Sequence, residues 1–339
     1  MTLYPNLLKK GAVFGVWTPS SPAPFLFPIR YKRAISAIQK RGYSVIEGAS
    51  CAKKHEFSPN FDRELAKDFH CLLTNPKVDA ILFSTGGHST ISVLPHINWE
   101  LIKQYPKPVI GYSDATVFLL AYYKMTQIIS FHGPMVISEW GEYGGPWEYT
   151  VKHFEQVLFS RECIRLHPPD YWTDEQLRWD EEDTKRRLPK GKGKWRFIKT
   201  GKAIGKLIGG NLPTLSLLVG SPFFPDLTNC ILFLEAHQLT PDHFYAYLMQ
   251  LKLARKLDKI CGLIIGRYAQ PKPTSSGFQS FDQIVKIVFE HHQIPILVDV
   301  DIGHTEPMLT LPIGGLVKLD SENNDFSLLM DRGVFIENS

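Results

Sequence analysis

The sequence predicts an α/β protein with two domains. Across residues 1–165, apolar runs of strand length alternate with segments of helical spacing, which is typical of a doubly wound, flavodoxin-like α/β domain. Residues 201–339 continue the alternation but are richer in glycine and short strands, which predicts a β-rich, barrel-like C-terminal α/β domain. Residues 166–200, which we call the tryptophan loop, interrupt the alternation of strands and helices between the two domains. A chain of 339 residues fits two domains, because single cores seldom grow this large.

The elements of the first domain follow from its apolar patterning. Residues 12–17 and 78–83 are near-continuous apolar runs, as expected for parallel strands covered on both faces. Residues 30–40 have helical apolar spacing, and Gly42 ends that helix. The same reasoning predicts strands at 44–46, 109–110 and 128–131, and helices at 60–74, 99–105 and 148–159.

The second domain repeats the alternation after residue 200. Its predicted strands are 203–208, 230–234, 262–265 and 296–300. Its predicted helices are 212–219, 241–257 and 281–292. Thr240 is suited to cap the middle helix, and Pro241 then occupies a first-turn position where proline is tolerated.

The composition excludes several classes of protein. A hydrophobic fraction of 44%, a charged fraction of 21% and a net charge of +4 are those of a globular protein without a nucleic-acid partner. Five scattered cysteines without a C-x-x-C pair indicate reduced thiols rather than disulfides or a zinc site. The N-terminus lacks a signal-peptide pattern, and the best apolar run, residues 117–129, is interrupted by Lys124. We therefore expect a cytoplasmic protein with no membrane partner.

A serine stands where a predicted strand turns into a predicted helix, within residues 108–123. Ser113 falls on the turn, which would push its hydroxyl clear of the sheet, and the N–H of Asp114 opens the helix, where negative charge is favoured. This layout is typical of a nucleophile elbow, although Ala115 replaces the second glycine of the G-x-S-x-G pattern. The alternative is that Ser113 or Asp114 only caps the helix.

Two strand ends in the second domain offer groups that could activate such a serine. A nucleophilic serine needs a base, and the base needs an acceptor that fixes its tautomer. Glu235 ends the apolar run 231–234, and His304 follows the strand at 296–300. Open α/β sheets bind ligands at strand ends, so both are candidates. The alternatives are an ion pair between Glu235 and a lysine or arginine, and a His304 that belongs only to a turn.

A metal site is a further alternative. Asp299, Asp301, His304 and Glu306 combine hard oxygen ligands with one imidazole, a set that could hold Mg, Mn or Zn. No second cluster of ligand spacing supports it, so we expect neither a metal nor a cofactor.

A glycine pair follows the strand at 78–83. Gly86 and Gly87 resemble the start of a phosphate-binding loop, but neither a third glycine nor a Lys-Ser/Thr pair completes a nucleotide fingerprint. Close backbone approach is the better use of such a pair, with the N–H of Gly87 as a second donor to an oxyanion.

The tryptophan loop has an unusual composition. It passes from an acidic to a basic stretch and contains Trp172, Trp179 and Trp195. The charges alone indicate a solvated surface loop. Large aromatics gain nothing in such a loop, whereas a lid that closes on a planar or apolar ligand would use them.

Five short blocks spread over essentially the whole chain are residues 83–87 (FSTGG), 109–114 (VIGYSD), 209–211 (GGN), 233–235 (FLE) and 303–307 (GHTEP). In this order they resemble the signature blocks of the LD-carboxypeptidase family of serine peptidases. The resemblance implies Ser113 as nucleophile, His304 as general base and Glu235 as its orienting acid. It also implies oxyanion donors at Gly87 and Asp114, an α/β N-terminal domain, a β-rich C-terminal domain and a homodimer.

Two branches of this family differ in substrate. Murein-recycling members remove a terminal D-Ala from a tetrapeptide, and members similar to the microcin C self-immunity protein cut the amide that joins a peptide or aminoacyl group to a nucleotide-like moiety. The tryptophan loop resembles the second branch, in which loop aromatics stack on the base, so Trp172 and Trp179 are expected to bind substrate together with Gly86 and His88. Residues 88–90 (HST) depart from both branches, which have an asparagine-rich or a Gly-Tyr-Gly-like stretch there.

The sequence thus predicts a serine carboxypeptidase-type hydrolase that acts on a small peptide or a peptidyl-nucleotide. The competing hypothesis from another class is a binding protein, in which the α/β domain and the tryptophan loop hold a nucleotide-like or peptide ligand and the triad is vestigial.

Overall fold

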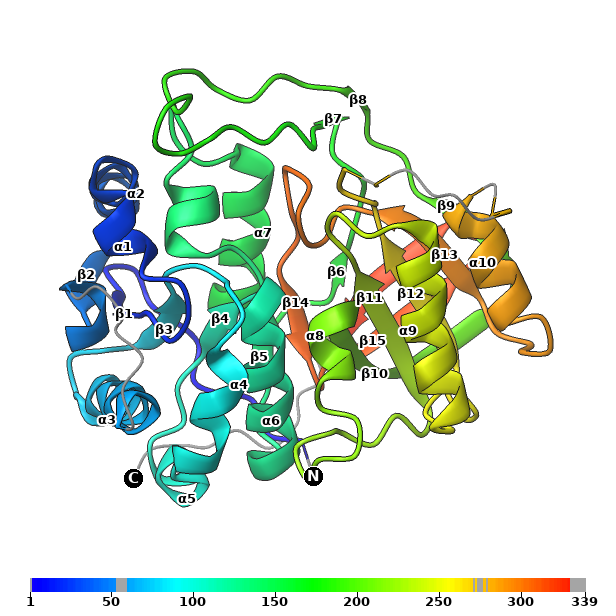
Figure 1. Cartoon of the computed structure of the whole chain (residues 1–339), viewed down its shortest axis with the longest axis horizontal. Helices are drawn as coiled ribbons and strands as arrows, with labels where there is room; N and C mark the ends of the chain where they lie inside the picture. The colour runs from blue at the N-terminus through cyan, green and yellow to red at the C-terminus, as the bar shows by residue number, and fades with distance from the viewer. Residues whose placement is uncertain (1, 53–59, 271, 273–276, 279, 330–339) are drawn as a thin grey trace.

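Two large β-sheets, each with its own helices, account for most of the described structure (Figure 1). The structure is a computed structural model that describes residues 2–52, 60–270, 272, 277–278 and 280–329. The end of the predicted second domain, residues 330–339, lies outside the described residues. The predicted mixed α/β class is confirmed. None of the described helices is long and apolar enough to cross a membrane.

The first sheet has five parallel strands in the order 2-1-3-4-5, the doubly wound order of flavodoxin-like folds. These strands are β1 (Val13–Trp17), β2 (Ser44–Glu47), β3 (Ala80–Phe83), β4 (Val109–Gly111) and β5 (Ser130–His132). Its helices are α1 (Ala23–Leu26), α2 (Pro28–Lys40), α3 (Phe61–Thr74), α4 (Thr90–Val93), α5 (Trp99–Gln104), α6 (Thr116–Thr126) and α7 (Glu148–Phe159). The predicted alternation of the first half is therefore present, with α1 and α4 as additional short helices.

The second sheet has eight strands, and its four central ones, β10 to β13, are parallel. In sheet order the strands are β6 (Ile164–Arg165), β16 (Asp325–Leu329), β15 (Leu316–Asp320), β10 (Lys202–Asn211), β11 (Cys230–Glu235), β12 (Gly262–Gly266), β13 (Ile296–Val300) and β9 (Arg196–Lys199). The helices of this half are α8 (Leu212–Ser216), α9 (Pro241–Leu253) and α10 (Phe281–Val288). All three end earlier than the sequence pattern predicts. For α9 the cause is visible, because Arg255 adopts a left-handed backbone at φ +57°.

Each half of the chain contributes one strand to the sheet of the other half. β14 (Leu311–Ile313) comes late in the chain but pairs antiparallel with β5 of the first sheet, and β6 pairs with β16 of the second. The tryptophan loop adds a small sheet of β7 (Tyr171–Trp172) and β8 (Gly191–Lys192). In Figure 1 the loop between these two strands runs across the top of the molecule, above both halves.

Helix α6 joins the two sheets. Nine of its eleven residues are buried, as expected for a helix that is apolar on every side. It packs on β5 of the first sheet and on α8 and β10 of the second. The N–H of Asn211, at the end of β10, donates to Thr116 Oγ1 at the start of α6 (3.1 Å). This contact brings the carboxyl ends of β4, β10 and β11 together.

Replacing Phe118 of α6 tests how much the stability of the first half depends on its aromatic core. Its ring packs at centroid distances of 4.9 Å from Trp17, 4.9 Å from Phe69 and 5.8 Å from Phe83. We expect Phe118→Ala to lower the free energy of unfolding by about 3–5 kcal/mol, because the cavity cannot collapse among other large rings. Phe25→Ala, at a ring that is 48% exposed, should change it by no more than about 0.5 kcal/mol. Urea unfolding of both variants checks this, and equal losses would contradict it.

Candidate active site

Ser113 occupies a strained turn between β4 and α6. Its φ is +60°, a left-handed conformation that non-glycine residues rarely adopt. The sharp turn predicted for a nucleophile elbow is therefore present. Ser113 makes no capping bond to α6, and the Asp114 carboxylate instead accepts from the N–H and hydroxyl of Thr90 (3.0 and 2.6 Å). Neither side chain therefore caps α6, in contrast to the alternative considered above.

The structure brings Ser113, His304 and Glu235 together from three distant parts of the chain. His304 Nε2 lies 3.0 Å from Ser113 Oγ, and His304 Nδ1 lies 2.8 Å from Glu235 Oε2. Glu235 makes this contact in place of the lysine or arginine pair considered above. An alcohol, an imidazole and a carboxylate joined in this sequence have the geometry that makes a serine nucleophilic.

The Glu235 carboxylate is buried at the end of β11. Burial raises its pKa, but the charge and hydrogen bond of His304, the nearby His132 and the Asn211 amide together outweigh burial, so the pKa of Glu235 lies below its ordinary value. Asn211 Nδ2 donates to Glu235 Oε1 at 2.9 Å while Asn211 Oδ1 caps α8. The carboxylate is therefore ionised at neutral pH and held from both sides.

The loop that carries His304 fits closely over Glu235. Gly303 has φ +84°, and a Cβ at that position would collide with the Glu235 carboxylate. Only glycine supplies both the conformation and the space. The loop can therefore reach the end of β11 and place the imidazole beside it.

A second imidazole stacks on the first. The His237 ring lies 4.5 Å from the His304 ring at an angle of 14°, and Gln176 of the tryptophan loop contacts the His237 ring nitrogens at 3.1 and 3.3 Å. Burial, followed by the proximity of His304, lowers the pKa of His237 to about 4. His237 is therefore neutral at pH 7 and adds no charge beside His304.

The glycine pair after β3 lies against the elbow. A Cβ on Gly86 would stand 3.0 Å from Ser113 Oγ, and a Cβ on Gly87, at φ +151°, would collide with Ser20. Within the described part of the chain, the N–H groups of Gly87 and Asp114 donate to no protein acceptor. Both remain available to a ligand, as an oxyanion hole requires.

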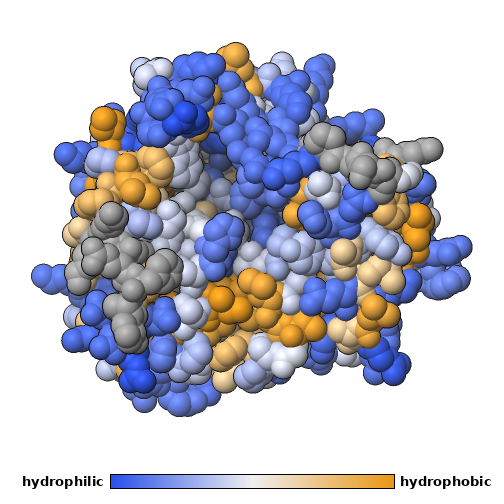
Figure 2. Space-filling model, viewed as in Figure 1, coloured by the Kyte–Doolittle hydropathy of each residue, from blue (hydrophilic) through white to orange (hydrophobic). Residues whose placement is uncertain are grey.

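A cavity of about 300 Å³ opens over these groups and extends under the tryptophan loop. Ser113, His304, Gly86, Gly87 and Trp179 are among the residues that line it. Figure 2 shows this face of the molecule hollowed below the largely hydrophilic loop. The cavity is therefore built from both halves of the chain and from the tryptophan loop.

The expected substrate-binding residues separate into two groups. Gly86 and Trp179 line the cavity, and the Trp179 ring packs edge-on against Phe27 (5.4 Å) and under the Arg30 guanidinium (4.9 Å). Trp172 and His88 do not line it. Trp172 lies beneath the guanidinium of Arg267 at 4.5 Å, and His88 is exposed.

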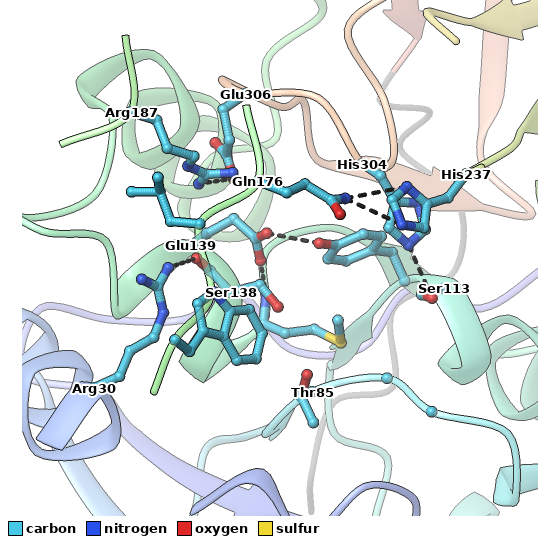
Figure 3. A pocket seen from close by; sticks show the side chains of 16 residues that line it. Arg30, Thr85, Ser113, Ser138, Glu139, Gln176, Arg187, His237, His304 and Glu306 are labelled. Atoms are coloured by element: carbon cyan, nitrogen blue, oxygen red, sulfur yellow. Dashed lines mark hydrogen bonds and ion pairs between the residues drawn. The ribbon is translucent and has the colours of Figure 1, made fainter. Parts of the chain in front are cut away.

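Charged side chains line the far end of the cavity, away from Ser113 (Figure 3). Arg187 of the tryptophan loop pairs with Glu306 (3.1 Å) and Glu142 (2.6 Å). Tyr112 donates to Glu139 at 2.8 Å and packs edge-on against the His304 ring at 5.0 Å. Tyr112 therefore connects the charged end of the cavity to the imidazole.

The four residues of the metal alternative are not brought together. Asp299 pairs with Arg196, Asp301 with Arg267 and Trp195, and Glu306 with Arg187. His304 is engaged by Ser113 and Glu235. Among the residues that the structure describes, no cluster of three potential ligand side chains could hold a metal ion.

Fold and site together define the class of protein: a two-domain α/β protein with the Ser-His-Glu geometry of serine hydrolases. The model of the LD-carboxypeptidase N-terminal domain matches residues 14–133, and the model of the C-terminal domain matches residues 204–319. The microcin C7 self-immunity protein MccF of Escherichia coli is 31% identical over 324 residues, which cover 95% of this chain and 94% of that protein. This chain belongs to the LD-carboxypeptidase family.

Solved structures agree with this assignment. Wild-type MccF without ligand has a TM-score of 0.90 at 31% identity, covering 96% of this chain and 97% of that one. An MccF-like protein from Bacillus anthracis has a TM-score of 0.88 at 30% identity, covering 97% and 99%. The muramoyltetrapeptide carboxypeptidase of Oxalobacter formigenes has a TM-score of 0.76 at 25% identity, covering 94% and 98%. The match spans both halves of the chain in each case.

Sequence reasoning assigned no role to several residues at this site. Asn211 belongs to the quoted block 209–211 and ends β10, and His237 lies two residues after β11, so their place at strand ends was an available signal. Glu139, Gln176 and Arg187 carried no such signal, because they come from a π-helical turn (Val136–Trp140) and from an irregular loop.

Buried His132 gives the site a measurable pH signature. Burial lowers its pKa to about 4, while an unfolded chain keeps an ordinary value of about 6.5. As pH falls, the unfolded state therefore binds this proton before the folded state does. The contribution of His132 to the free energy of unfolding is fully present above pH 6.5 and is lost as pH drops towards 4, by up to about 1.4 kcal/mol per pH unit. Urea unfolding at pH 7 and pH 5 should show that His132→Phe makes the drop in the free energy of unfolding between these pH values smaller by about 2 kcal/mol. The same drop in the wild type and in the variant would contradict this.

Proposed function

We propose that this protein is a serine carboxypeptidase-type hydrolase that cleaves an amide bond next to the carboxyl end of a small peptide or aminoacyl substrate. The observation that carries the proposal is the continuous contact Ser113–His304–Glu235, at 3.0 and 2.8 Å, on the wall of the cavity. The family assignment supports peptidase chemistry.

Each step of the proposed reaction uses a group that the fold positions. Ser113 Oγ attacks the scissile carbonyl while His304 Nε2 takes its proton, and ionised Glu235 stabilises the imidazolium. The N–H groups of Gly87 and Asp114 receive the oxyanion. His304 then protonates the leaving amine, and water, activated by the same imidazole, releases the acyl group from Ser113.

We further propose that the leaving group is nucleotide-like. Solved MccF structures contain aspartyl sulfamoyl adenosine, glutamyl sulfamoyl guanosine or, in a tryptophan-to-phenylalanine variant, adenosine monophosphate. Trp179 lies on the cavity wall of this chain, where a planar base could stack on it. The competing substrate is a murein tetrapeptide, which the match to a muramoyltetrapeptide carboxypeptidase favours. We also propose that the protein is cytoplasmic, which its scattered cysteines without a C-x-x-C pair favour, and that it is a homodimer, as the family resemblance implies.

Substitutions at the triad test the chemistry. We expect Ser113→Ala or His304→Ala to lower kcat about a million-fold and Glu235→Ala about ten thousand-fold, because the three act as one unit. Ser160→Ala and His291→Ala, which lie outside the cavity lining, should keep full turnover. Hydrolysis of an aminoacyl sulfamoyl adenosine and of a murein tetrapeptide provides the assay. Substantial activity in Ser113→Ala would refute the mechanism.

A covalent probe separates the hydrolase from the binding-protein hypothesis. A fluorophosphonate loses fluoride when an activated serine oxygen bonds to its phosphorus. We expect mass spectrometry to find the adduct on Ser113 in the wild type and none in His304→Ala, where no base takes the proton. A folded wild-type protein that binds ligand but forms no adduct would favour the binding protein.

The two tryptophans offer a matched test of the leaving group. Loss of a stacked base costs about 1–3 kcal/mol, so Trp179→Ala should lower kcat/KM for the aminoacyl sulfamoyl adenosine by about 10- to 100-fold and affect the murein tetrapeptide less. Trp172→Ala should have the smaller effect, because Trp172 lies outside the cavity lining. Equal losses on both substrates for Trp179→Ala would exclude stacking on a base.

A further inference from the structure

The charged end of the cavity brings two carboxyl groups and two guanidinium groups together. Glu139 and Glu306 line it together with Arg30 and Arg187 (Figure 3). Both carboxyl side chains are almost fully buried, with exposed fractions of 2% each. Buried carboxylates of this kind need partners, so the hydrogen bonds of each group decide what the site can accept.

The two guanidinium groups are already engaged. Arg30 donates from Nε to Ile137 O (2.8 Å), from Nη1 to Asp183 (2.6 Å) and from Nη2 to Ser138 O (2.8 Å). Arg187 donates from Nε to Glu142 (2.7 Å), and its Nη2 lies within ion-pair distance of Glu142 and Glu306, without a well-directed hydrogen bond to either. An anion that approached these cations would also meet the buried carboxyls of Glu139 and Glu306. This end of the cavity is therefore poorly suited to a carboxylate or a phosphate.

The carboxyl groups, by contrast, are not satisfied. Glu139 accepts from the Tyr112 hydroxyl (2.8 Å) and from the N–H of Met135 (2.7 Å). Glu306 pairs with Arg187 through Oε1, whereas no N–H or O–H of the described residues donates to its Oε2. Glu139 and Glu306 are electrostatic neighbours, and a hydrogen bond between two carboxyls is open to them. Such a bond exists only while one of them holds a proton.

The electrostatics agree with a shared proton. Burial and then the charge of Glu306 raise the pKa of Glu139 well above its ordinary value. Burial likewise raises the pKa of Glu306, with Glu142 as a further negative neighbour, although Arg187 opposes the shift. Arg30 is the more distant cation, 3.9 Å from Glu142. Neighbouring buried carboxyls seldom ionise together, so these shifts favour a pair that shares one proton.

We propose that the Glu139–Glu306 pair is a subsite for a primary ammonium group of the substrate. The ammonium takes the place of the shared proton, donates to Glu306 Oε2 and Glu139, and leaves both carboxyls ionised beside it. The charge of the site is unchanged by this exchange, since one cation replaces one proton. The subsite rests on the proposed function, because it assigns part of the same cavity to the same substrate.

The position of the pair fits a group on the residue next to the scissile bond. Tyr112 bonds to Glu139 through its hydroxyl and packs against His304 through its ring, so one tyrosine side chain separates the pair from the imidazole. The α-ammonium of an aminoacyl group and the side-chain ammonium of a diamino acid in a murein peptide both offer the required chemistry within such a reach.

Binding to the Ser113→Ala protein tests the subsite without turnover. The probes are an aminoacyl sulfamoyl adenosine and its N-acetyl derivative, and a murein tetrapeptide with a free or an acetylated side-chain amine. In at least one pair we expect acetylation to weaken binding by about 10- to 100-fold, the usual range for a lost hydrogen bond to a charged group. The pair that responds identifies which ammonium binds. Equal affinities within both pairs, or no binding of either free amine, would overturn the proposal.

Calorimetry in two buffers of different ionisation enthalpy supplies an independent readout. Binding of the free-amine ligand to Ser113→Ala should release up to one proton near pH 7. The additional substitution Glu306→Gln in the same protein should abolish both this proton release and the preference for the free amine. Glu148→Gln, at an exposed ion pair with Arg41, is the matched control and should change neither. Proton release that survives Glu306→Gln in a folded protein would contradict the assignment. Amine-dependent binding without wild-type hydrolysis would instead reject the proposed function and keep the subsite.

Discussion

The contact between Glu235 and His304 is the interaction on which the rest of the site depends. A carboxylate buried at a strand end is costly unless a charged or strongly polar partner compensates for its lost hydration. The imidazole supplies that compensation on one side and the Asn211 amide on the other. Because Glu235 is fixed by β11, His304 is fixed in turn, and its free nitrogen can point only towards Ser113.

The arrangement of the two sheets makes this contact possible. Helix α6 is buried on nearly all sides and holds the carboxyl ends of β4, β10 and β11 against one another. Two glycines then remove the remaining steric obstacles, Gly303 over the Glu235 carboxylate and Gly86 beside Ser113. The strained φ of Ser113 is the local cost of exposing its hydroxyl. A rigid, buried helix is well suited to absorb such strain, since its own packing leaves the turn little freedom.

The sequence predicted the fold class and the elbow because both leave local patterns, such as apolar strands that end in a polar residue. Glu235 is the last residue of β11, Ser113 lies two residues after β4, and His304 lies four residues after β13. Glu139, Gln176 and Arg187 could not be found this way, because tertiary contacts alone bring a π-helical turn and an irregular loop to the cavity. Composition also could not separate Trp172 from Trp179. Their different positions follow from partners far away in sequence, Arg267 for one and Phe27 for the other.

The tryptophan loop connects both ends of the cavity. Gln176 contacts His237, which stacks on His304, while Arg187 of the same loop pairs with Glu306 and Glu142. One segment therefore contacts the neighbours of the imidazole and the acidic pair at once. A ligand ammonium bound to Glu306 would share this carboxylate with Arg187. A ligand at the far end of the cavity would therefore contact the same loop whose Gln176 contacts His237, the ring stacked on His304. Two side chains of a single loop thus contact both the proposed ammonium subsite and the histidine that stacks on His304.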